Sequence, residues 1–203
     1  MDADFNELVH PRHSAVLVID IQNDSCHPDG SYAASGMDIS LRRQAAHNAA
    51  DFIKQARNYG VPVIFTKETH TRWDESASWS RRTKRVNRPP VCVEGTWGEQ
   101  FYLVEPLAGE AVIGKRRYSC FPGTELDLLL RRKRITTLIL TGGGTQACVE
   151  STARDGFELD YEIVVVSDCC GTPSLDEHEP ALKRMASLCA TVVTAKDILE
   201  AWS

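Results

Sequence analysis

The segment TGGGTQACVESTARD, residues 141–155, places one cysteine where a strand is expected to give way to a helix. Residues 134–140, which precede it, are apolar and β-branched, as is typical of a strand buried on both faces. Three glycines end this strand, and the chain is expected to become helical from Gln146 onward, with small and apolar residues available to pack. The pattern therefore predicts that Cys148 lies in the first turn of a helix.

This position makes Cys148 a candidate nucleophile. The unpaired amides and positive dipole at a helix N-terminus favour a thiolate, so we expect the pKa of Cys148 to be lowered. The same amides would hold a developing oxyanion. The alternative is a small buried core residue, and the residues leave both interpretations open, since packing explains the apolar run but not the glycines.

Two charged residues follow other predicted strands. The apolar run from residue 14 ends at Asp20, and a short one from residue 111 ends at Lys115. Because the carboxyl ends of parallel strands form the ligand crevice of an open sheet, both side chains can converge on Cys148. A lysine between a carboxylate and a thiol suits amide hydrolysis. Alternatively, Asp20 only forms a turn or caps a helix, and Lys115 belongs to a solvated basic turn.

The alternation of strands and helices predicts an α/β fold, a three-layer α/β/α sandwich with a six-stranded parallel sheet. At 203 residues the chain suits one domain, spanning residues 1–203. Strands are expected at residues 14–20, 61–66, 111–114, 135–141, 162–167 and 191–194. Helices are expected at residues 41–59, 124–132, 146–159, 176–189 and 197–202. Residues 69–90 are expected to form a long polar loop.

Composition narrows the class of protein. The net charge of −5 offers no general attraction for nucleic acid, and a 42% hydrophobic content argues against wholesale disorder. The longest apolar runs are too short for a membrane span, and the first residues are acidic where a signal peptide would be basic. We therefore expect a cytoplasmic protein whose partners are neither nucleic acid nor membrane.

Three motifs together carry a family resemblance: VIDIQND at residues 18–24, KRRYSCF at residues 115–121, and the segment of residues 141–155. With them the chain resembles the isochorismatase-like cysteine hydrolase superfamily, whose fold is Rossmann-like, over nearly its whole length. The residues after Lys115, together with VEGTWG at residues 93–98, look like the ureidoacrylate and biuret amidohydrolase branch.

The resemblance implies a cofactor-free enzyme with a catalytic triad. Asp20 would accept the thiol proton, Lys115 would stabilise charge, and Cys148 would attack the carbonyl of a small amide, ureido or carbamoyl substrate. The backbone amides of Gly144 and Cys148 would form the oxyanion hole, and relatives carry a cis peptide at the position of Gly143 and Gly144. Relatives form dimers and tetramers, so a homodimer or homotetramer is expected.

Substrate contacts are also implied by the resemblance, with His70 equally interpretable as a surface or hydrogen-bonding histidine. The expected substrate-binding residues are Gln22, Ser25, His70, Trp97, Tyr118 and Phe121. Many relatives have phenylalanine where this chain has Ser25, which weakens the case for an aromatic-ring substrate. The metal-binding pattern of nicotinamidases begins at Glu68 and His70, but Ser76 occupies its last position, so we expect no catalytic metal.

The polar stretch of residues 69–90 is a candidate pocket lid that supplies a cation for an anionic substrate, or else an interface or solvent loop. Its large and basic side chains are Arg72, Trp73, Trp79, Arg81, Arg82, Arg85 and Arg88.

Two other functions remain open at this point. One is the isochorismatase type of vinyl ether hydrolysis, which does not need a nucleophilic thiol. The other is a nonhydrolytic binding or redox-sensing protein, in which Cys148 would be oxidised without catalytic turnover.

Overall fold

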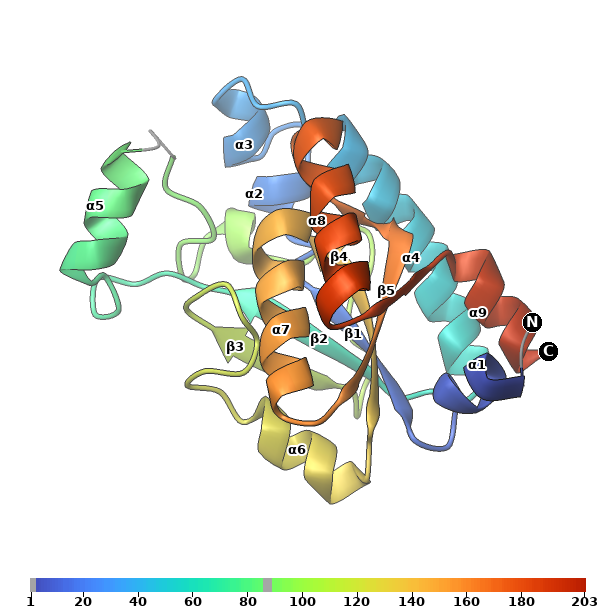
Figure 1. The fold of residues 1–203 in the computed structure, drawn as a ribbon. Helices are drawn as coiled ribbons and strands as arrows, with labels where there is room; N and C mark the ends of the chain where they lie inside the picture. The colour runs from blue at the N-terminus through green and yellow to red at the C-terminus, as the bar shows by residue number, and fades with distance from the viewer. Residues whose placement is uncertain (1–2, 86–88) are drawn as a thin grey trace.

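The computed structural model describes residues 3–85 and 89–203, and a six-stranded sheet lies at its centre (Figure 1). The strand order is β3-β2-β1-β4-β5-β6, and every neighbouring pair is parallel, so the predicted sheet is confirmed. The strands are β1 (Ser14–Ile19), β2 (Val63–Glu68), β3 (Ala111–Lys115), β4 (Thr137–Gly143), β5 (Glu162–Gly171) and β6 (Thr191–Val193).

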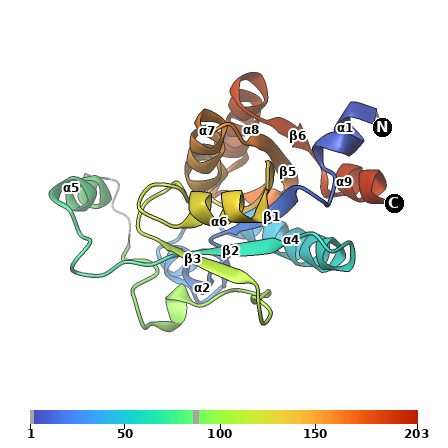
Figure 2. The ribbon, with the colours of Figure 1, turned by 90° about the horizontal axis from the view of Figure 1, so that it is seen from below.

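Helices cover both faces of the sheet, which confirms the three-layer sandwich (Figure 2). Helices α1 (Ala3–Leu8), α4 (Ser40–Asn58) and α9 (Ala195–Trp202) pack on one face. Helices α6 (Leu126–Lys133), α7 (Glu150–Glu158) and α8 (Leu175–Leu188) pack on the other. In β1, Val16 and Val18 face the first group while Leu17 and Ile19 face the second, as the two-residue period of a strand requires.

Four further short elements lie in the connections between strands and helices and, like α1, were not predicted. They are the helices α2 (Asn23–Cys26), α3 (Ser31–Ala34) and α5 (Ala77–Arg85), and the 3₁₀ turn η1 (Trp97–Glu99). The predicted loop at residues 69–90 is therefore wrong over α5. The Ser76 hydroxyl accepts a hydrogen bond from the Trp79 amide at 3.2 Å, and basic residues complement the dipole in the last turn. Arg88 lies outside the described residues.

The strand order reverses between β1 and β4. From β1 the chain moves outward through β2 and β3, and it then returns to build β4, β5 and β6 on the other side. Such a switch point is where open α/β sheets bind ligands, beyond the carboxyl ends of the strands. Asp20 directly follows β1, and the turn that carries Cys148 directly follows β4.

The end of β4 depends on glycine. The strand runs two residues further than predicted and includes Gly142, which pairs with Ile19 of β1. Gly142 has a φ of 125°, and a Cβ atom there would overlap the Ile19 carbonyl. Glycine therefore permits the close approach of β4 to β1 at the site.

Among the described residues, no helix combines the length and apolar character needed to span a bilayer.

We predict that Gly142→Ala destabilises the protein by about 3 kcal/mol or more, because the new methyl group meets fixed backbone and the positive φ adds strain. The free energy of unfolding in urea measures this effect. Gly114→Ala in β3 is the matched control, since a Cβ atom there meets nothing within 4 Å and it should change stability by less than about 1 kcal/mol. Equal effects of the two substitutions would contradict the prediction.

Candidate active site

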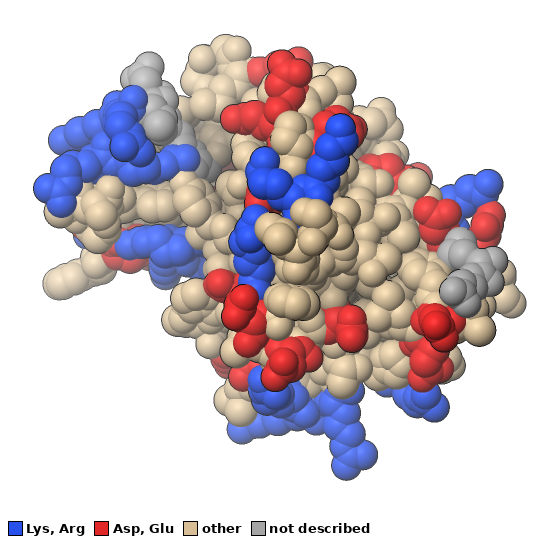
Figure 3. All heavy atoms as spheres, viewed as in Figure 1, with Lys and Arg blue, Asp and Glu red and all other residues tan. Residues whose placement is uncertain are grey.

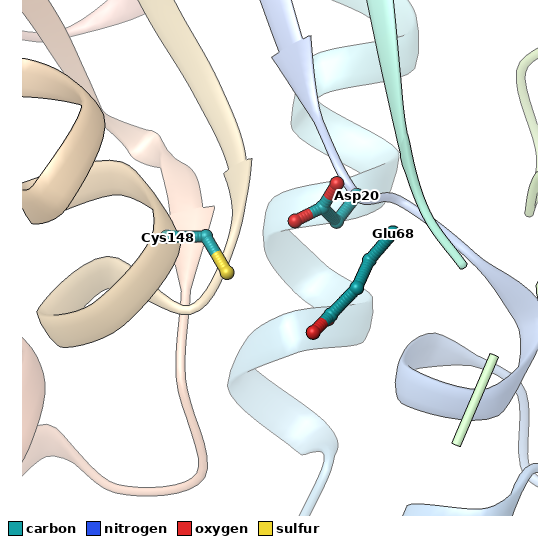
Figure 4. Close-up of side chains that lie close together, drawn as sticks. All are labelled: Asp20, Glu68 and Cys148. Atoms are coloured by element: carbon teal, nitrogen blue, oxygen red, sulfur yellow. The ribbon is translucent and has the colours of Figure 1, made fainter. Parts of the chain in front are cut away.

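Asp20, Lys115 and Cys148 meet at the carboxyl ends of β1, β3 and β4. Lys115 Nζ lies 2.7 Å from Asp20 Oδ2 and 3.6 Å from Cys148 Sγ. Figure 4 shows the side chains of Asp20, Glu68 and Cys148 pointing toward a common centre. One ammonium therefore contacts both the carboxylate and the thiol, which is the convergence that the sequence predicts.

Asp20 is held in an unusual backbone conformation. Its φ is 51°, in the left-handed region that non-glycine residues rarely adopt. The Thr66 hydroxyl donates a hydrogen bond to Asp20 Oδ1 at 2.8 Å, while Oδ2 faces the ammonium of Lys115. The strained backbone and the two contacts together fix the direction of the carboxylate, as is common at functional sites.

Lys115 is the last residue of β3 and is only 1% exposed. Its ammonium also donates a hydrogen bond to the Arg117 carbonyl at 2.8 Å. Burial alone would lower the pKa of Lys115, but the nearby Asp20 carboxylate, with smaller effects from Cys148 and Glu68, raises this pKa well above its ordinary value. Lys115 therefore stays charged and acts as a fixed cation.

Cys148 lies in one turn of π-helix, η2 (Thr145–Val149), which precedes α7. The expected lowering of its pKa is wrong. Burial raises the pKa of the Cys148 thiol well above its ordinary value, and the opposing effect of Lys115 is smaller. Cys148 does lie in the first helical turn, as predicted, because η2 continues directly into α7, but the effect of burial exceeds any effect of that position. The resting site therefore holds a neutral thiol beside an Asp20–Lys115 ion pair.

The glycine turn before Cys148 also differs from expectation. The peptide between Gly143 and Gly144 is trans, and the chain turns instead through a left-handed Gly144, with a φ of 76°. The Gly144 amide donates a hydrogen bond to the Gly171 carbonyl at 2.8 Å, so in this conformation it is not directed at a substrate. The Cys148 amide stays the predicted oxyanion donor.

The donor atoms of Asp20, Glu68 and Cys148 lie within 4.8 Å of one another, a spacing that a metal ion would accept. However, the cation between Asp20 and Cys148 is already the Lys115 ammonium. The Glu68 carboxylate in turn contacts His70 Nε2 at 3.0 Å. Asp20, Glu68 and Cys148 thus already have partners, and Lys115 supplies the positive charge of the site. This arrangement does not fit a metal centre.

A cavity of about 270 Å³ opens onto Cys148. Gln22, Ser25 and Tyr118 line it, as the resemblance implies. The Gln22 side chain is fully occupied with backbone, because its nitrogen donates to the carbonyls of Glu68 and Glu99 and its oxygen accepts from the Glu68 amide. Gln22 therefore fixes the wall of the cavity.

Three expected substrate contacts lie outside this cavity. His70 lines a neighbouring one and stacks on Trp79, with ring centroids 5.1 Å apart. Trp97 is 45% exposed and packs edge-on against His27. Phe121 belongs to the core between the sheet and α7, where it stacks on Tyr161. Each of these side chains packs against another aromatic or imidazole ring.

Several charged residues line the cavity but were not predicted individually as site residues from the sequence. They are Arg42, Glu68, Arg82 and Glu177. The sequence pattern of α4 does point to Arg42, because this residue shares the buried face of the helix with Ala45, Ala46 and Ala49 at helical spacing. A charged residue in such a stripe needs a partner or a ligand.

Comparison with known proteins places these features in one family. The isochorismatase domain model matches residues 14–197. The ureidoacrylate amidohydrolase RutB of Methylobacterium radiotolerans is 34% identical over 194 residues, covering 85% of this chain and 72% of that protein.

Two solved structures are similar in fold. A cysteine hydrolase from Pseudomonas syringae pv. phaseolicola superposes with a TM-score of 0.83 at 21% identity, covering 96% of this chain and 94% of that chain. The N-carbamoylsarcosine amidase of Thermoplasma acidophilum superposes with a TM-score of 0.72 at 26% identity, covering 90% and 96% of the two chains.

The raised pKa of Cys148 predicts slow alkylation of the free protein. A raised pKa means a smaller thiolate fraction at neutral pH, so the rate with iodoacetamide should keep rising with pH past the ordinary cysteine pKa of 9.0. Peptide mapping by mass spectrometry assigns the rate to Cys148, and Cys148→Ser provides the blank. A rate that levels off below the ordinary pKa would contradict the neutral resting thiol.

Proposed function

Because this chain belongs to the isochorismatase family, we propose that it is a cysteine-dependent amidohydrolase. It is a hydrolase of carbon–nitrogen bonds other than peptide bonds, and its substrate is a small amide, ureido or carbamoyl compound. The observation that carries the proposal is the Lys115 ammonium, which contacts both the Asp20 carboxylate and the Cys148 thiol. The names of two similar proteins, ureidoacrylate amidohydrolase and N-carbamoylsarcosine amidase, support the substrate class.

In the first half of the reaction, Asp20 takes the proton of Cys148 as the sulfur attacks the substrate carbonyl carbon. The carbonyl oxygen becomes an oxyanion, which the Cys148 amide stabilises while Lys115 balances the negative charge of the site. The oxyanion then collapses and the carbon–nitrogen bond breaks. Asp20 gives its proton to the leaving nitrogen, and ammonia or an amine departs from a thioester on Cys148.

In the second half, water replaces the departed amine. Asp20 removes a proton from this water as its oxygen adds to the thioester carbonyl. The new tetrahedral centre collapses, the carbon–sulfur bond breaks, and Cys148 recovers a proton from Asp20. Lys115 remains protonated throughout, because its pKa is raised well above the ordinary value. The raised pKa of Cys148 fits this scheme, since the thiol needs a base at the moment of attack.

The two alternative functions use the same site less well. Vinyl ether hydrolysis of the isochorismatase type needs no thiol, so it leaves the contact between Lys115 and Cys148 without a purpose. A redox sensor reacts through a thiolate, whereas the pKa of the Cys148 thiol is raised well above its ordinary value. Both observations favour the amidohydrolase.

We further propose that residues 1–203 act as one catalytic domain, since both halves of the single sheet contribute to the site. A homodimer or homotetramer, a cytoplasmic location and activity on biuret stay predictions of the resemblance. Sedimentation velocity measures the oligomeric state directly.

Ammonia release from a panel of small substrates tests the proposed function. The panel contains ureidoacrylate, biuret, N-carbamoyl amino acids, maleamate and nicotinamide. We expect release from at least one carbamoyl or ureido compound, and we expect Cys148→Ser, Asp20→Asn and Lys115→Ala each to lower kcat/KM by about 100-fold or more.

Lys67→Met is the matched control for the loss of a lysine. Lys67 lies on β2 and pairs with Glu99 at 3.1 Å, away from the triad, so its replacement should leave kcat/KM within about threefold of the wild type. Circular dichroism confirms that each variant is folded. Ammonia release that survives Cys148→Ser would refute the thioester mechanism.

A further inference from the structure

Arg42 places a positive charge in the cavity that contains Cys148. The residue is 8% exposed and lines the same cavity as Cys148. Among the described residues, no carboxylate lies within 4.0 Å of its guanidinium, and its Nε has no hydrogen-bond acceptor. Its guanidinium lies over the Tyr32 ring, whose centroid is 5.1 Å from Arg42 Cζ. A buried arginine with so little compensation is expected to meet an anion that the free protein does not contain.

The glycines before Cys148 make room for this guanidinium. A Cβ atom at Gly143 would come within 2.8 Å of Arg42 Nη1. A Cβ atom at Gly144 would lie 3.6 Å from Arg42 Nη2 and 3.4 Å from the Cys148 amide nitrogen. The open face of Gly144 is therefore flanked by the guanidinium and by the amide of the nucleophile. Two kinds of donor border the space in which a substrate must lie.

Arg82 of α5 lines the cavity as well. Its Nη1 is buried without a hydrogen-bond acceptor among the described residues, and its guanidinium lies over the Tyr118 ring, 5.4 Å from the centroid. Figure 3 shows that Lys and Arg side chains gather over α5. Arg82 therefore brings part of this positive surface to the cavity.

The acidic residues of the cavity do not neutralise these arginines, because each has another partner. Asp20 pairs with Lys115, and Glu68 contacts His70. Glu177 accepts a hydrogen bond from the Gln146 side chain at 2.8 Å. In the described part of the chain, neither guanidinium group has a carboxylate partner that would keep it from a ligand.

We propose that Arg42 is the residue that selects a carboxylate on the substrate, with Arg82 of α5 as a second contact. The inference rests on the proposed function and narrows it to ureido, carbamoyl or amide compounds that also carry a carboxylate. The planar guanidinium can donate two parallel hydrogen bonds to a carboxylate. The cavity of about 270 Å³ has room for a small ureido, carbamoyl or amide compound that carries one. Because Arg42 adjoins the Gly143–Gly144 turn, the bound carboxylate would orient the scissile bond toward Cys148.

Calorimetric binding to protein carrying Cys148→Ala, which prevents turnover, tests this proposal. The ligands are 3-ureidopropionate and its carboxamide, 3-ureidopropionamide, together with maleamate and maleamide, so that each pair differs only in the carboxylate. We expect the carboxylate of at least one pair to bind about 30-fold or more tightly than its carboxamide. Adding Arg42→Met should abolish this preference, whereas Arg42→Lys should retain part of it.

Arg43→Met is the matched control, because Arg43 follows Arg42 on α4 and is exposed. It should leave the preference unchanged. The Tm of the unliganded protein distinguishes ligand recognition from a structural role: Arg42→Met should keep or raise Tm, because it removes a charge that has no ion-pair partner. Arg82→Met should reduce the preference less than Arg42→Met does.

Equal affinity for carboxylate and carboxamide in both pairs, or no binding in either, would overturn the proposal. A preference that persists in Arg42→Met would also overturn it, as would a lowered Tm with unchanged preference. These results do not depend on the nucleophile, since Cys148 is absent from the tested protein. Failure of the proposed function would instead appear as ammonia release that survives Cys148→Ser.

Discussion

The buried ammonium of Lys115 is the constraint on which the site depends. A buried ammonium costs several kcal/mol unless anions surround it, so Lys115, at 1% exposure, requires Asp20 at 2.7 Å. The sheet meets this requirement through its register, in which Lys115 pairs with Glu68 of β2 and Ile19, just before Asp20, pairs with Gly142 of β4. The parallel strands thus bring the ammonium of Lys115, the carboxylate of Asp20 and the thiol of Cys148 to one edge of the sheet.

The three glycines before Cys148 are a second constraint on the site, and each meets a different steric or conformational requirement. Gly142 lets β4 approach the Ile19 carbonyl, Gly143 leaves space for Arg42, and Gly144 turns the chain in a left-handed conformation. The resulting turn buries Cys148 and raises the pKa of its thiol. Under the proposed mechanism, the neutral Cys148 thiol becomes reactive only when Asp20 takes its proton.

The fold could be predicted from the sequence because the six strands are apolar or β-branched and alternate with helices, and Asp20, Lys115 and Cys148 lie at or just after the ends of three of them. Two of the predictions that were wrong concern properties that depend on contacts between residues far apart in the sequence. Burial reversed the expected pKa shift of Cys148, and a bond to Gly171 occupied the Gly144 amide. Helix α5 was missed because its residues are polar and its stabilising contacts are a local cap and favourable end charges. The proposed role of Arg42 depends on its position in the folded cavity and on its unpaired Nε, which the sequence alone does not reveal.

The central claim is that Cys148 forms a thioester during turnover, and rapid-quench peptide mapping by mass spectrometry measures this most directly. Wild-type protein is mixed with a substrate that releases ammonia, quenched in acid within the first turnover, digested and mapped. The account predicts a transient mass increase, equal to the acyl or carbamoyl group, on the peptide that contains Cys148. An unmodified Cys148 peptide throughout the first turnover, with ammonia appearing at the normal rate and Cys148→Ser still active, would contradict it.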